Sequence, residues 1–538
     1  MDIQRQAAAD APYWAWVNKL HIDGRPFDLE GRGYQMEIMR SKTDDGKIKT
    51  NEVIRKGSQI GITMGKVIEI THGALHGLYP QGIIYYFPSA KAVEHFSTTR
   101  FKPFISDNDM VRKHCSDINA VAIRRIAKTN VNFFGCSATV RIGGHEKDSN
   151  AVRSTPADWI LLDERDLFDP EMAKQVNQRL GNSKINRRTD LGTPKLPDDG
   201  VDLIYGKSDM RRWQIKCGVC GKHTCMESDF PNCIGLLEGV GFPRCIHCGE
   251  KIERAKGAWI PDAPQKDVVG YWVSQLLNPN RDLAHVLKES QDPEAYDTNE
   301  AEFQRTVMGL PFIASEDRLT EADVYGCCDK NTPMAYSHNG PCAAGWDVGP
   351  NALHVVIGHK ITNDRFRIVR TARVPDFDAL HDLLSKYNIK AGVGDAQPEV
   401  HKMRDFQKQE SFGVYLCYYQ PHLKSFDSWD QDIGVVKVNR TEVFDATHRM
   451  VVSPGKLLIP RHCSEIQVFA HQLTCAAKSL EENGNTGTME YRYRKIGDKQ
   501  DHYRNALNYF YLACKKVGVP ESQHSRKRAT TQNMDYKL

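Results

Sequence analysis

Long apolar runs are absent from the sequence, and with them the features of a membrane or secreted protein. No run approaches the ~20 apolar residues that a membrane-spanning helix requires. The N-terminal residues Met1–Arg5 are not followed by the apolar core of a signal peptide. Internal repeats and long low-complexity stretches are also missing. We therefore expect a chain of the cytoplasm without a membrane segment.

A large charge of one sign is absent as well. The net charge is +4 over 538 residues, and 40% of the residues are hydrophobic, which is typical of a soluble globular protein. The length predicts roughly three to four domains. So small a net charge permits contacts with nucleic acid through local patches but does not require them.

A disulfide framework is the third feature that the sequence lacks. Its 15 cysteines are odd in number and are scattered along the chain, apart from one dense cluster. In a reducing compartment this pattern indicates one metal site together with ordinary buried thiols.

A candidate phosphate loop is present at 53–63, where a strand is followed by a glycine-containing loop and a helix. Such a loop directs backbone N–H groups and a helix N-terminus at a phosphate. The standard P-loop has a lysine directly before its Ser or Thr, but this position is Ile62. We predict instead that Lys56, at the start of the loop, reaches back over the phosphates.

Three further residues complete this prediction. Gly57 and Gly61 shape the loop, and Thr63 holds Mg²⁺. Lys66 is an alternative lysine, but Val67 follows it, so no hydroxyl would reach the metal. A glycine-rich turn without a nucleotide is the other alternative.

A pair of carboxylates follows the apolar run 159–162, about 100 residues after the loop. Open α/β sheets bind ligands at the carboxyl ends of their strands. Asp163 is the candidate ligand of Mg²⁺, directly or through water, and Glu164 the candidate base for the attacking water. A strand followed by a solvated acidic turn is the alternative, since Arg165 and Asp166 continue the charged run.

The loop after the next strand contains Gly192 and Thr193. One prediction is that this loop senses the γ-phosphate, as such loops do in ATP-driven motors. A simple turn fits the residues equally well.

The dense cysteine cluster consists of two Cys-x-x-Cys pairs, Cys217 with Cys220 and Cys245 with Cys248. Four thiolates on a tetrahedral ion are typical of structural Zn²⁺ and leave no open position for catalysis. The interval of 24 residues between the pairs is slightly long for a zinc ribbon, and a hairpin would absorb it. Neighbouring residues that could substitute as ligands are Cys225, Cys233, His223 and His247.

Three acids in the C-terminal part stand at the ends of predicted elements. Asp347 ends a first strand, Asp395 ends a later strand, and Asp501 begins a late helix. This order matches an RNase H-like nuclease, in which such carboxylates hold two Mg²⁺ or Mn²⁺ ions about 4 Å apart. Asp498 is an alternative third ligand. Lys402 and Arg404 either contact the scissile phosphate or form a solvated helix face.

The order of these motifs resembles the lambda-type family of tailed-phage terminase large subunits over roughly residues 30 to 515. That family also places the phosphate-loop lysine at the start of the loop. Segments 85–89, 96–104 and 303–311 resemble further ATPase segments of the family, and Gln35 occupies the place of its adenine-recognising glutamine. The family commonly has an Asp where this chain has Asn505, which puts the third nuclease ligand in question.

The predicted fold class is α/β, with an N-terminal P-loop NTPase domain whose parallel sheet is of the helicase and terminase type. A zinc-ribbon insertion interrupts it, and an RNase H-like α/β nuclease domain follows. The predicted divisions are 1–205 for the ATPase motor, 206–262 for the zinc ribbon, 263–335 for a mostly helical completion of the motor and linker, 336–516 for the nuclease and 517–538 for a disordered tail.

The resemblance implies an ATPase that moves double-stranded DNA into a procapsid and an endonuclease that cuts it. The implied cofactors are ATP and Mg²⁺ or Mn²⁺, beside the Zn²⁺ predicted from the cysteines. The implied partners are DNA, a small terminase subunit, the portal protein and further copies of the chain in a ring. The implied location is the host cytoplasm, with transient docking on the procapsid and no place in the mature virion.

Three points stay open in the sequence. The arginine finger comes from the chain or from a neighbour, and Arg153 is a candidate only because it lies near Asp163. A helicase-nuclease of repair or restriction would share the ATPase motifs. A zinc-ribbon DNA-binding protein with decayed enzymatic domains is favoured by Ile62 and Asn505.

Overall fold

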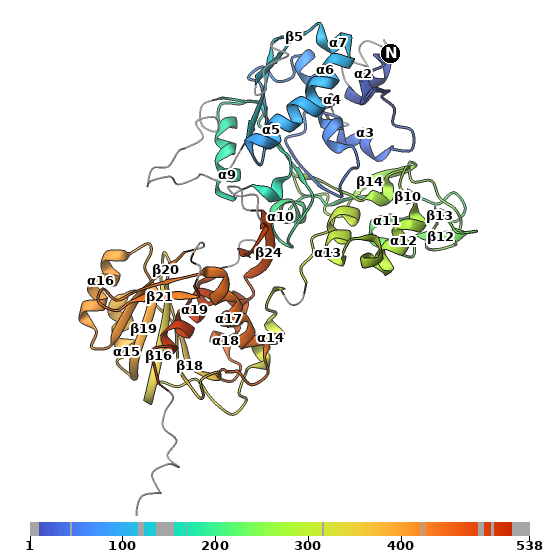
Figure 1. Cartoon of the computed structure of the whole chain (residues 1–538). Coiled ribbons are helices and arrows are strands. Elements are labelled where there is room, and N and C mark those ends of the chain that lie inside the picture. Colours follow the sequence, from blue (N-terminus) through green and yellow to red (C-terminus); the bar gives the residue numbers. More distant parts are fainter. Residues whose placement is uncertain are drawn as a thin grey trace, which may run out of the picture. The chain divides into compact units, whose positions relative to one another are not determined.

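The computed structural model describes residues 10–43, 46–116, 123–135, 155–168, 170–314, 317–420, 423, 425–482, 489–496 and 500–518 (Figure 1). The chain divides into two compact units, Met1–Ile313 and Ala314–Leu538. None of the helices formed by these described residues has the length and apolarity needed to cross a lipid bilayer. The division into five parts stays a prediction, and most of the predicted tail lies outside the described residues.

An eleven-stranded sheet forms the centre of the first unit. Its middle strands are parallel and follow the order β15-β3-β9-β8-β4-β7. Strands β4 and β8 are buried along their whole length, because helices cover both faces of a parallel sheet. These strands are β3 (Asn51–Lys56), β4 (Ile83–Phe87), β7 (Thr129–Gly135), β8 (Trp159–Leu162), β9 (Arg187–Gly192) and β15 (Val269–Val273). The predicted α/β class with a parallel sheet is confirmed for this unit.

Further strands extend this sheet on both sides. One side carries the antiparallel strands β5 (Cys115–Ser116) and β6 (Ile123–Ile126). On the other side β10 (Arg211–Lys216) pairs in parallel with β15, and β11 (His223–Thr224) and β14 (Gly257–Pro261) pair antiparallel with β10. Two small antiparallel pairs are β1 (His21–Ile22) with β2 (Arg25–Pro26), and β12 (Ile234–Leu237) with β13 (Val240–Pro243).

The helices of the first unit surround the sheet. The longest, α4 (Ile62–Leu75), starts directly after the phosphate loop and is buried for most of its length. The other α-helices are α2 (Ala11–Val17), α3 (Tyr34–Ile38), α5 (Ala90–Phe96), α6 (Lys102–Asp107), α7 (Asp109–Arg112), α9 (Pro170–Gln175), α10 (Gly200–Gly206), α11 (Met226–Asp229), α12 (Leu283–Gln291) and α13 (Glu300–Glu302). The 3₁₀ and π-helical segments are η1 (Ser97–Phe101), η2 (Arg165–Leu167), η3 (Val176–Leu180), η4 (Gln275–Leu277), η5 (Pro293–Tyr296) and η6 (Phe303–Met308).

Strand β15 lies within 263–335, the segment that was predicted to be mostly helical. It pairs in parallel with β3, the strand that leads into the phosphate loop. The run Val269–Val273 is short and contains a glycine, so its sequence pattern is weak, and only the pairing partner makes it a strand. Strands β10 and β14, which border the cysteine-rich segment, belong to the same sheet.

The second unit has an eight-stranded sheet in the order β21-β22-β20-β19-β16-β17-β18-β23. Strands β16, β17 and β18 are antiparallel, whereas β19 and β20 continue parallel to β16 on its other side. The strands are β16 (His338–Val348), β17 (Leu353–Lys360), β18 (Phe366–Val374), β19 (Tyr387–Asp395), β20 (Gly413–Tyr419), β21 (Asp427–Asp430), β22 (Val435–Val438) and β23 (Leu457–Leu458). A separate antiparallel pair consists of β24 (Ala476–Glu482) and β25 (Met489–Lys495).

Helix α19 (His502–Cys514) packs directly on β16. A Cβ atom at Gly345 would lie 2.0 Å from the backbone nitrogen of Phe510, so this close approach requires glycine. Figure 1 places α19 near α17 and α18 in this unit. The other helices are α14 (Glu321–Gly326), α15 (Phe377–Leu384), α16 (Val400–Gln409), α17 (Arg440–Val452) and α18 (Ser464–Leu473).

Candidate functional site

The first centre lies at the carboxyl edge of the sheet in the first unit. Lys56 is the last residue of β3, the acidic pair follows β8, and β9 separates these two strands. The Lys56 Nζ donates to Glu164 Oε1 at 3.1 Å. The Thr63 Oγ1, in the first turn of α4, donates to Asp163 Oδ2 at 3.2 Å. Side chains predicted separately from two motifs therefore meet in one place.

Burial and charge oppose one another in this centre. Burial raises the pKa of Asp163, and the neighbouring Lys56 ammonium partly offsets this rise. Burial acts to lower the pKa of Lys56, but Glu164 and Asp163 together hold it above its usual value. Lys56 is therefore a charged ammonium, only 6% exposed, whose charge two carboxylates compensate.

Tyr85 is a member of the centre that the sequence reasoning missed. Its hydroxyl, on β4, donates to Asp163 Oδ2 at 2.8 Å. The sequence run 85–89 resembles an ATPase segment, but nothing in it indicates that this tyrosine reaches the acid. The contact fixes one oxygen of Asp163 between two hydroxyl groups, those of Tyr85 and Thr63.

The backbone of Glu164 has φ 52° and ψ 51°, in the left-handed region that non-glycine residues seldom adopt. Such conformations persist only where surrounding structure enforces them, and they are frequent at functional sites. Here the turn brings the Glu164 carboxylate to Lys56 while leaving its side chain 42% exposed. The carboxylate is thus anchored on one side and accessible to water.

The phosphate loop is held by backbone contacts. The N–H of Gly57 donates to Val273 O at 2.8 Å, and the N–H of Ser58 donates to Thr306 O at 2.7 Å. A Cβ at Gly57 would lie 2.6 Å from Thr306 O, so only glycine fits there. Gly61, at φ 81°, begins α4 without a side-chain cap, which leaves the first-turn N–H groups for an anionic ligand.

Lys66, the alternative phosphate lysine, is fully buried in an ion network. Its Nζ lies 2.6 Å from Glu52 Oε2 and 2.8 Å from Glu69 Oε2. Arg187 binds the other oxygen of Glu69 at 2.7 Å. The Lys66 alternative is therefore wrong, because its ammonium is bound to two carboxylates beneath the loop and not at its surface.

Gln35 contacts the phosphate loop. Its Nε2 donates to Ile60 O at 2.6 Å and lies 3.3 Å from the Tyr34 hydroxyl. The side chain is buried, and a Cβ at Gly61 would lie 3.3 Å from this nitrogen. The predicted role in adenine recognition stays a prediction.

Gly192 ends β9 directly beside the acidic turn. A Cβ at Gly192 would lie 2.9 Å from Arg165 N and 3.3 Å from Glu164 Cα. Thr193 follows it. The two predicted coupling residues thus begin the segment that touches the turn carrying Glu164.

Asp166 is a second residue that the sequence reasoning missed, because it was assigned to a solvated charged run. It is 5% exposed, and burial raises its pKa to about 7. Its oxygens accept the N–H groups of Lys195 at 3.1 Å and Val201 at 3.0 Å. The solvated-turn alternative is therefore wrong, and Asp166 ties the acidic turn to the segment after Thr193.

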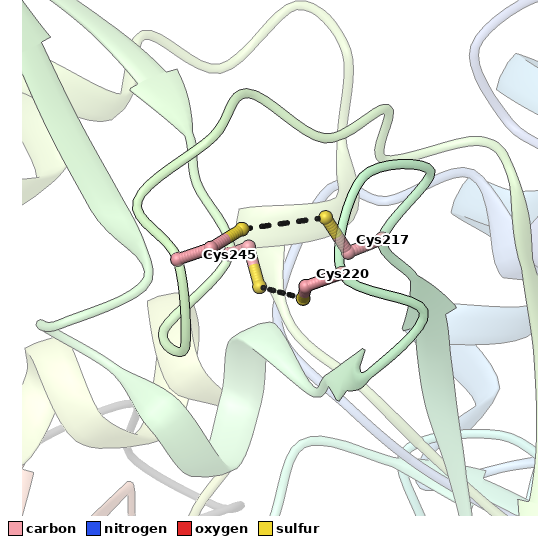
Figure 2. Close-up of side chains that lie close together, drawn as sticks. Cys217, Cys220 and Cys245 are labelled. Atoms are coloured by element: carbon pink, nitrogen blue, oxygen red, sulfur yellow. Dashed lines mark hydrogen bonds between the residues drawn. The ribbon is translucent and has the colours of Figure 1, made fainter.

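The four predicted zinc ligands form one cluster. Figure 2 shows the side chains of Cys217, Cys220 and Cys245 pointing toward one another from two loops. The sulfur atoms of Cys217 and Cys248 are 3.7 Å apart, and those of Cys220 and Cys245 are 3.6 Å apart. An ion with Zn–S bonds of about 2.3 Å would separate its tetrahedral sulfur ligands by about 3.8 Å. The donor set and its spacing therefore fit Zn²⁺.

Each cysteine pair is shaped by a tight turn. The Cys217 N–H donates to Lys222 O and the Cys245 N–H to Glu250 O, both at 2.8 Å. Gly221 and Gly249, one residue after the second cysteine of each pair, have φ of +71° and +81°. Burial acts to raise the pKa of Cys245, but the N–H groups of Cys248 and His247 lower it to about 6. Backbone donors thus favour the thiolate that a metal binds.

The alternative ligands do not join this cluster. Among the described residues, the four cysteines alone form a group of three or more potential metal ligands whose atoms all lie within 4.8 Å of one another. Burial raises the pKa of Cys225 and of Cys233 to about 12, and His247 contacts the His223 carbonyl.

The second centre contains the three predicted nuclease acids. Asp347 is near the end of β16, Asp395 ends the adjacent parallel strand β19, and Asp501 precedes α19. Burial raises the pKa of Asp395 to about 6, and Asp347 raises it further. Burial also raises the pKa of Asp347, with a contribution from Asp501. Asp347 is therefore near enough to Asp395 and to Asp501 for charges to interact within each of these two pairs.

His502 belongs to this centre and was missed. Its Nδ1 lies 2.7 Å from Asp347 Oδ2, and its ring stacks on His354 with centroids 4.6 Å apart. Asn505, which replaces the acid of the family pattern, donates to Asp501 Oδ2 at 3.5 Å. His502 directly follows Asp501 in the sequence, and this position could have indicated that it belongs to the centre.

Four further residues were predicted to act at the two centres. Two of them, Asp498 and Arg153, lie outside the described residues. Lys402 is 68% exposed and pairs with Glu399 at 2.6 Å. The Arg404 guanidinium donates to Ile433 O and to Gln407, so local contacts occupy it.

Comparisons with known proteins agree with this geometry. Residues 26–263 match the family model described as the ATPase domain of phage terminase large subunit gpA, a range that contains both ATPase motifs and the cysteine cluster. The large terminase of bacteriophage HK97 is 10% identical, with a TM-score of 0.52, over 94% of this chain and 99% of that one.

The large terminase of a thermophilic bacteriophage is 11% identical, with a TM-score of 0.33, over 88% of this chain and 97% of that one. The comparison with curated protein sequences gave no match. The HK97 likeness shows a shared fold, and the family model covers the predicted ATPase motifs but less than half of the chain. Residues 26–263 are therefore similar to the ATPase domain of phage terminase large subunits.

Proposed function

We propose that this protein hydrolyses ATP to move viral double-stranded DNA into a procapsid and cuts the DNA concatemer with a metal-dependent nuclease. The observation that carries the proposal is the convergence of Lys56, Thr63, Asp163 and Glu164 at one edge of the sheet, within the ATPase domain of the family.

Each residue of the first centre has a chemical role in the proposal. Asp163 and Thr63 would hold Mg²⁺, which would supply charge stabilisation to the phosphates. Glu164 orients the attacking water and accepts its proton. Lys56 exchanges its contact with Glu164 for one with the phosphates, which frees that carboxylate to act as base. Gly192, Thr193 and Asp166 then transmit the change from the acidic turn to the following segment.

ATP hydrolysis with and without DNA tests the first half of the proposal. We expect Lys56→Ala and Glu164→Gln each to slow hydrolysis by about 10²-fold or more. The matched controls are Lys91→Ala and Glu94→Gln, both exposed on α5, which should hydrolyse ATP like the wild type. Equal hydrolysis by all variants would refute the loop assignment, and DNA strand separation driven by ATP would favour the helicase-nuclease alternative.

For the second half, the sheet order β18-β17-β16-β19-β20 supports an RNase H-like nuclease, because it brings Asp347 and Asp395 to neighbouring strand ends. Among the described residues, neither acid forms an ion pair with a lysine or arginine. Two neighbouring acids without a lysine or arginine partner are suited to bind a divalent cation. Asp347, Asp395 and Asp501 would hold Mg²⁺ or Mn²⁺, which activates water and stabilises the leaving oxygen.

The proposed partners and location rest on the similarity of residues 26–263 to phage terminase large subunits. A packaging motor accepts any sequence, so its DNA contacts are mainly to phosphates. We propose a ring of this chain docked on the portal protein of the procapsid, with a small terminase subunit that selects the viral DNA. ATP-dependent protection of DNA from added nuclease, in the presence of procapsids, measures this activity directly; absence of protection would refute translocation.

We also propose that the four cysteines hold one structural Zn²⁺. The matching sulfur separations support this, as do the two tight turns that present the thiols. Metal analysis of the purified protein should give about one zinc ion per chain. Cys217→Ser should lose it, whereas Cys115→Ser, outside the cluster, should keep it, and a wild-type protein without zinc would end the claim.

A further inference from the structure

The end of β15 lies against the phosphate loop. Gln275, the first residue of η4, donates from Nε2 to both the carbonyl and the Oγ of Ser58, each at 3.1 Å. Two residues earlier, Val273 O accepts the Gly57 N–H at 2.8 Å. The strand end therefore fixes two consecutive loop residues, the first of which follows Lys56 directly.

A buried acid from the cysteine-rich segment holds this strand end. Glu227 Oε1 accepts the Ser274 N–H at 3.3 Å and the Ser274 hydroxyl at 3.1 Å. The Ser274 Oγ in turn accepts the Leu276 N–H at 3.2 Å, which caps η4. Glu227 is only 4% exposed, so its position is set by protein contacts and not by solvent.

Glu227 stands between the two cysteine pairs, on α11. Strand β11, just before α11, pairs with β10, which leads into Cys217. The Ile246 N–H, between the second pair of cysteines, donates to Thr224 Oγ1 at 3.4 Å. After α11, Cys233 O accepts the Arg244 N–H at 2.8 Å. The segment that carries Glu227 is therefore connected on both sides to the turns that the four thiols close.

We propose that Gln275 is a positioning residue for the phosphate loop and that Glu227 links its position to the cysteine cluster. The inference rests on the proposed binding of ATP at this loop. The path runs from the cluster through Glu227 and Ser274 to Gln275 and Ser58. It keeps Lys56 in place for the phosphates, so nucleotide affinity depends on a metal site that contacts no nucleotide.

Removing either end of this path should weaken nucleotide binding in the full-length protein. We expect Gln275→Ala and Glu227→Ala each to raise the Kd for ADP by about tenfold, a typical coupling between two sites. Glu227→Gln should bind like the wild type, because its amide oxygen still accepts both Ser274 donors. The matched control is Gln407→Ala, which removes a glutamine that donates to Val414 O and Gly434 O in the second unit.

The pairing of variants separates positioning from general damage. Because both residues act on one path, the double variant Glu227→Ala/Gln275→Ala should bind ADP about as weakly as either single one. Chelation of zinc should weaken binding about tenfold in the wild type and add little in Gln275→Ala. Zinc content, measured in parallel, should be unchanged in Gln275→Ala.

The outcomes that overturn the inference differ from those that overturn the function. Wild-type affinity in Gln275→Ala, or full additivity in the double variant, would refute the path while Lys56→Ala still loses binding. Failure of the wild type to bind ADP at all would refute the proposed function itself.

Discussion

The two acidic centres differ in how their charge is compensated. In the first, the buried Lys56 ammonium lies 3.1 Å from Glu164 and holds its charge against burial. In the second, Asp347 has His502 as its ion-pair partner, and Lys495 approaches Asp501 to 3.7 Å at a partly exposed site. One centre has a buried lysine fixed between its acids, whereas the acids of the other have only a histidine and a partly exposed lysine nearby.

This difference separates two uses of carboxylates. A lysine fixed beside a buried acid favours the charged form of that acid, and a nucleotide can bring its metal later. Acids that have only a histidine and a partly exposed lysine nearby repel one another more strongly until divalent ions arrive. We infer that the first centre is complete before its substrate binds, whereas the second is completed by metal.

The largest expected effect is on DNA cleavage. Asp347→Ala removes a proposed metal ligand, so cutting of plasmid DNA with Mn²⁺ should fall by more than about 100-fold. This loss exceeds the one expected for a residue that only supports a metal ligand. ATP hydrolysis should be unchanged, as should cutting by the exposed control Asp405→Ala. Undiminished cutting by Asp347→Ala would remove the second centre from the comparison.

Glu227 sharpens the comparison, since it is a buried acid with hydroxyl, amide and thiol partners. Burial raises its pKa to about 7 from 4.5. The folded state therefore keeps the Glu227 proton to a higher pH than the unfolded state does. The stability that the protonated Glu227 contributes is present below pH 4.5 and is lost as the pH rises to 7. Relative to wild type, Glu227→Gln should gain up to about 3 kcal/mol between pH 5 and pH 8 in denaturant unfolding.

The exposed control Glu253→Gln should show no such gain over the same pH range. Because zinc binding changes with pH in every variant, the difference from wild type at each pH is the quantity to compare. A difference that stays constant with pH would show that Glu227 is not protonated in the folded state.

Divalent metal should stabilise the second unit more than the first. Mn²⁺ at 100 times its Kd adds about 2.7 kcal/mol to the free energy of unfolding of a protein that binds it only when folded. In nucleotide-free protein we expect this gain in the second unit, measured by hydrogen exchange. The variant Asp395→Asn should lose the gain. An equal gain in the first unit would break the comparison.

The smallest expected effect is on the first unit. Lys56→Met leaves Asp163 and Glu164 without their cation and should lower the free energy of unfolding by about 2 kcal/mol, less than for a fully buried pair because Glu164 is partly exposed. Glu94→Gln serves as the control. If denaturant unfolding shows no loss for Lys56→Met, the lysine does not compensate the acids.

Local patterns predicted much of the chain. The apolar run before Asp163 and Glu164 indicated a buried strand with acids at its carboxyl end, since a parallel strand needs apolar residues on both faces. Two Cys-x-x-Cys pairs indicated a cluster because each pair presents two thiols from one turn. The acids at the ends of β16 and β19 could be predicted for the same reason as those at the end of β8.

The tertiary structure alone decided how these pieces are used. Short β15 became a strand because β3 offered a partner, and Lys66, on α4, was excluded because Glu52, on β3, binds its ammonium. Asp166, Gln275 and His502 gained their contacts from segments distant in sequence. Periodicity and spacing describe one element at a time, whereas burial and hydrogen bonds between elements depend on how the chain folds back on itself.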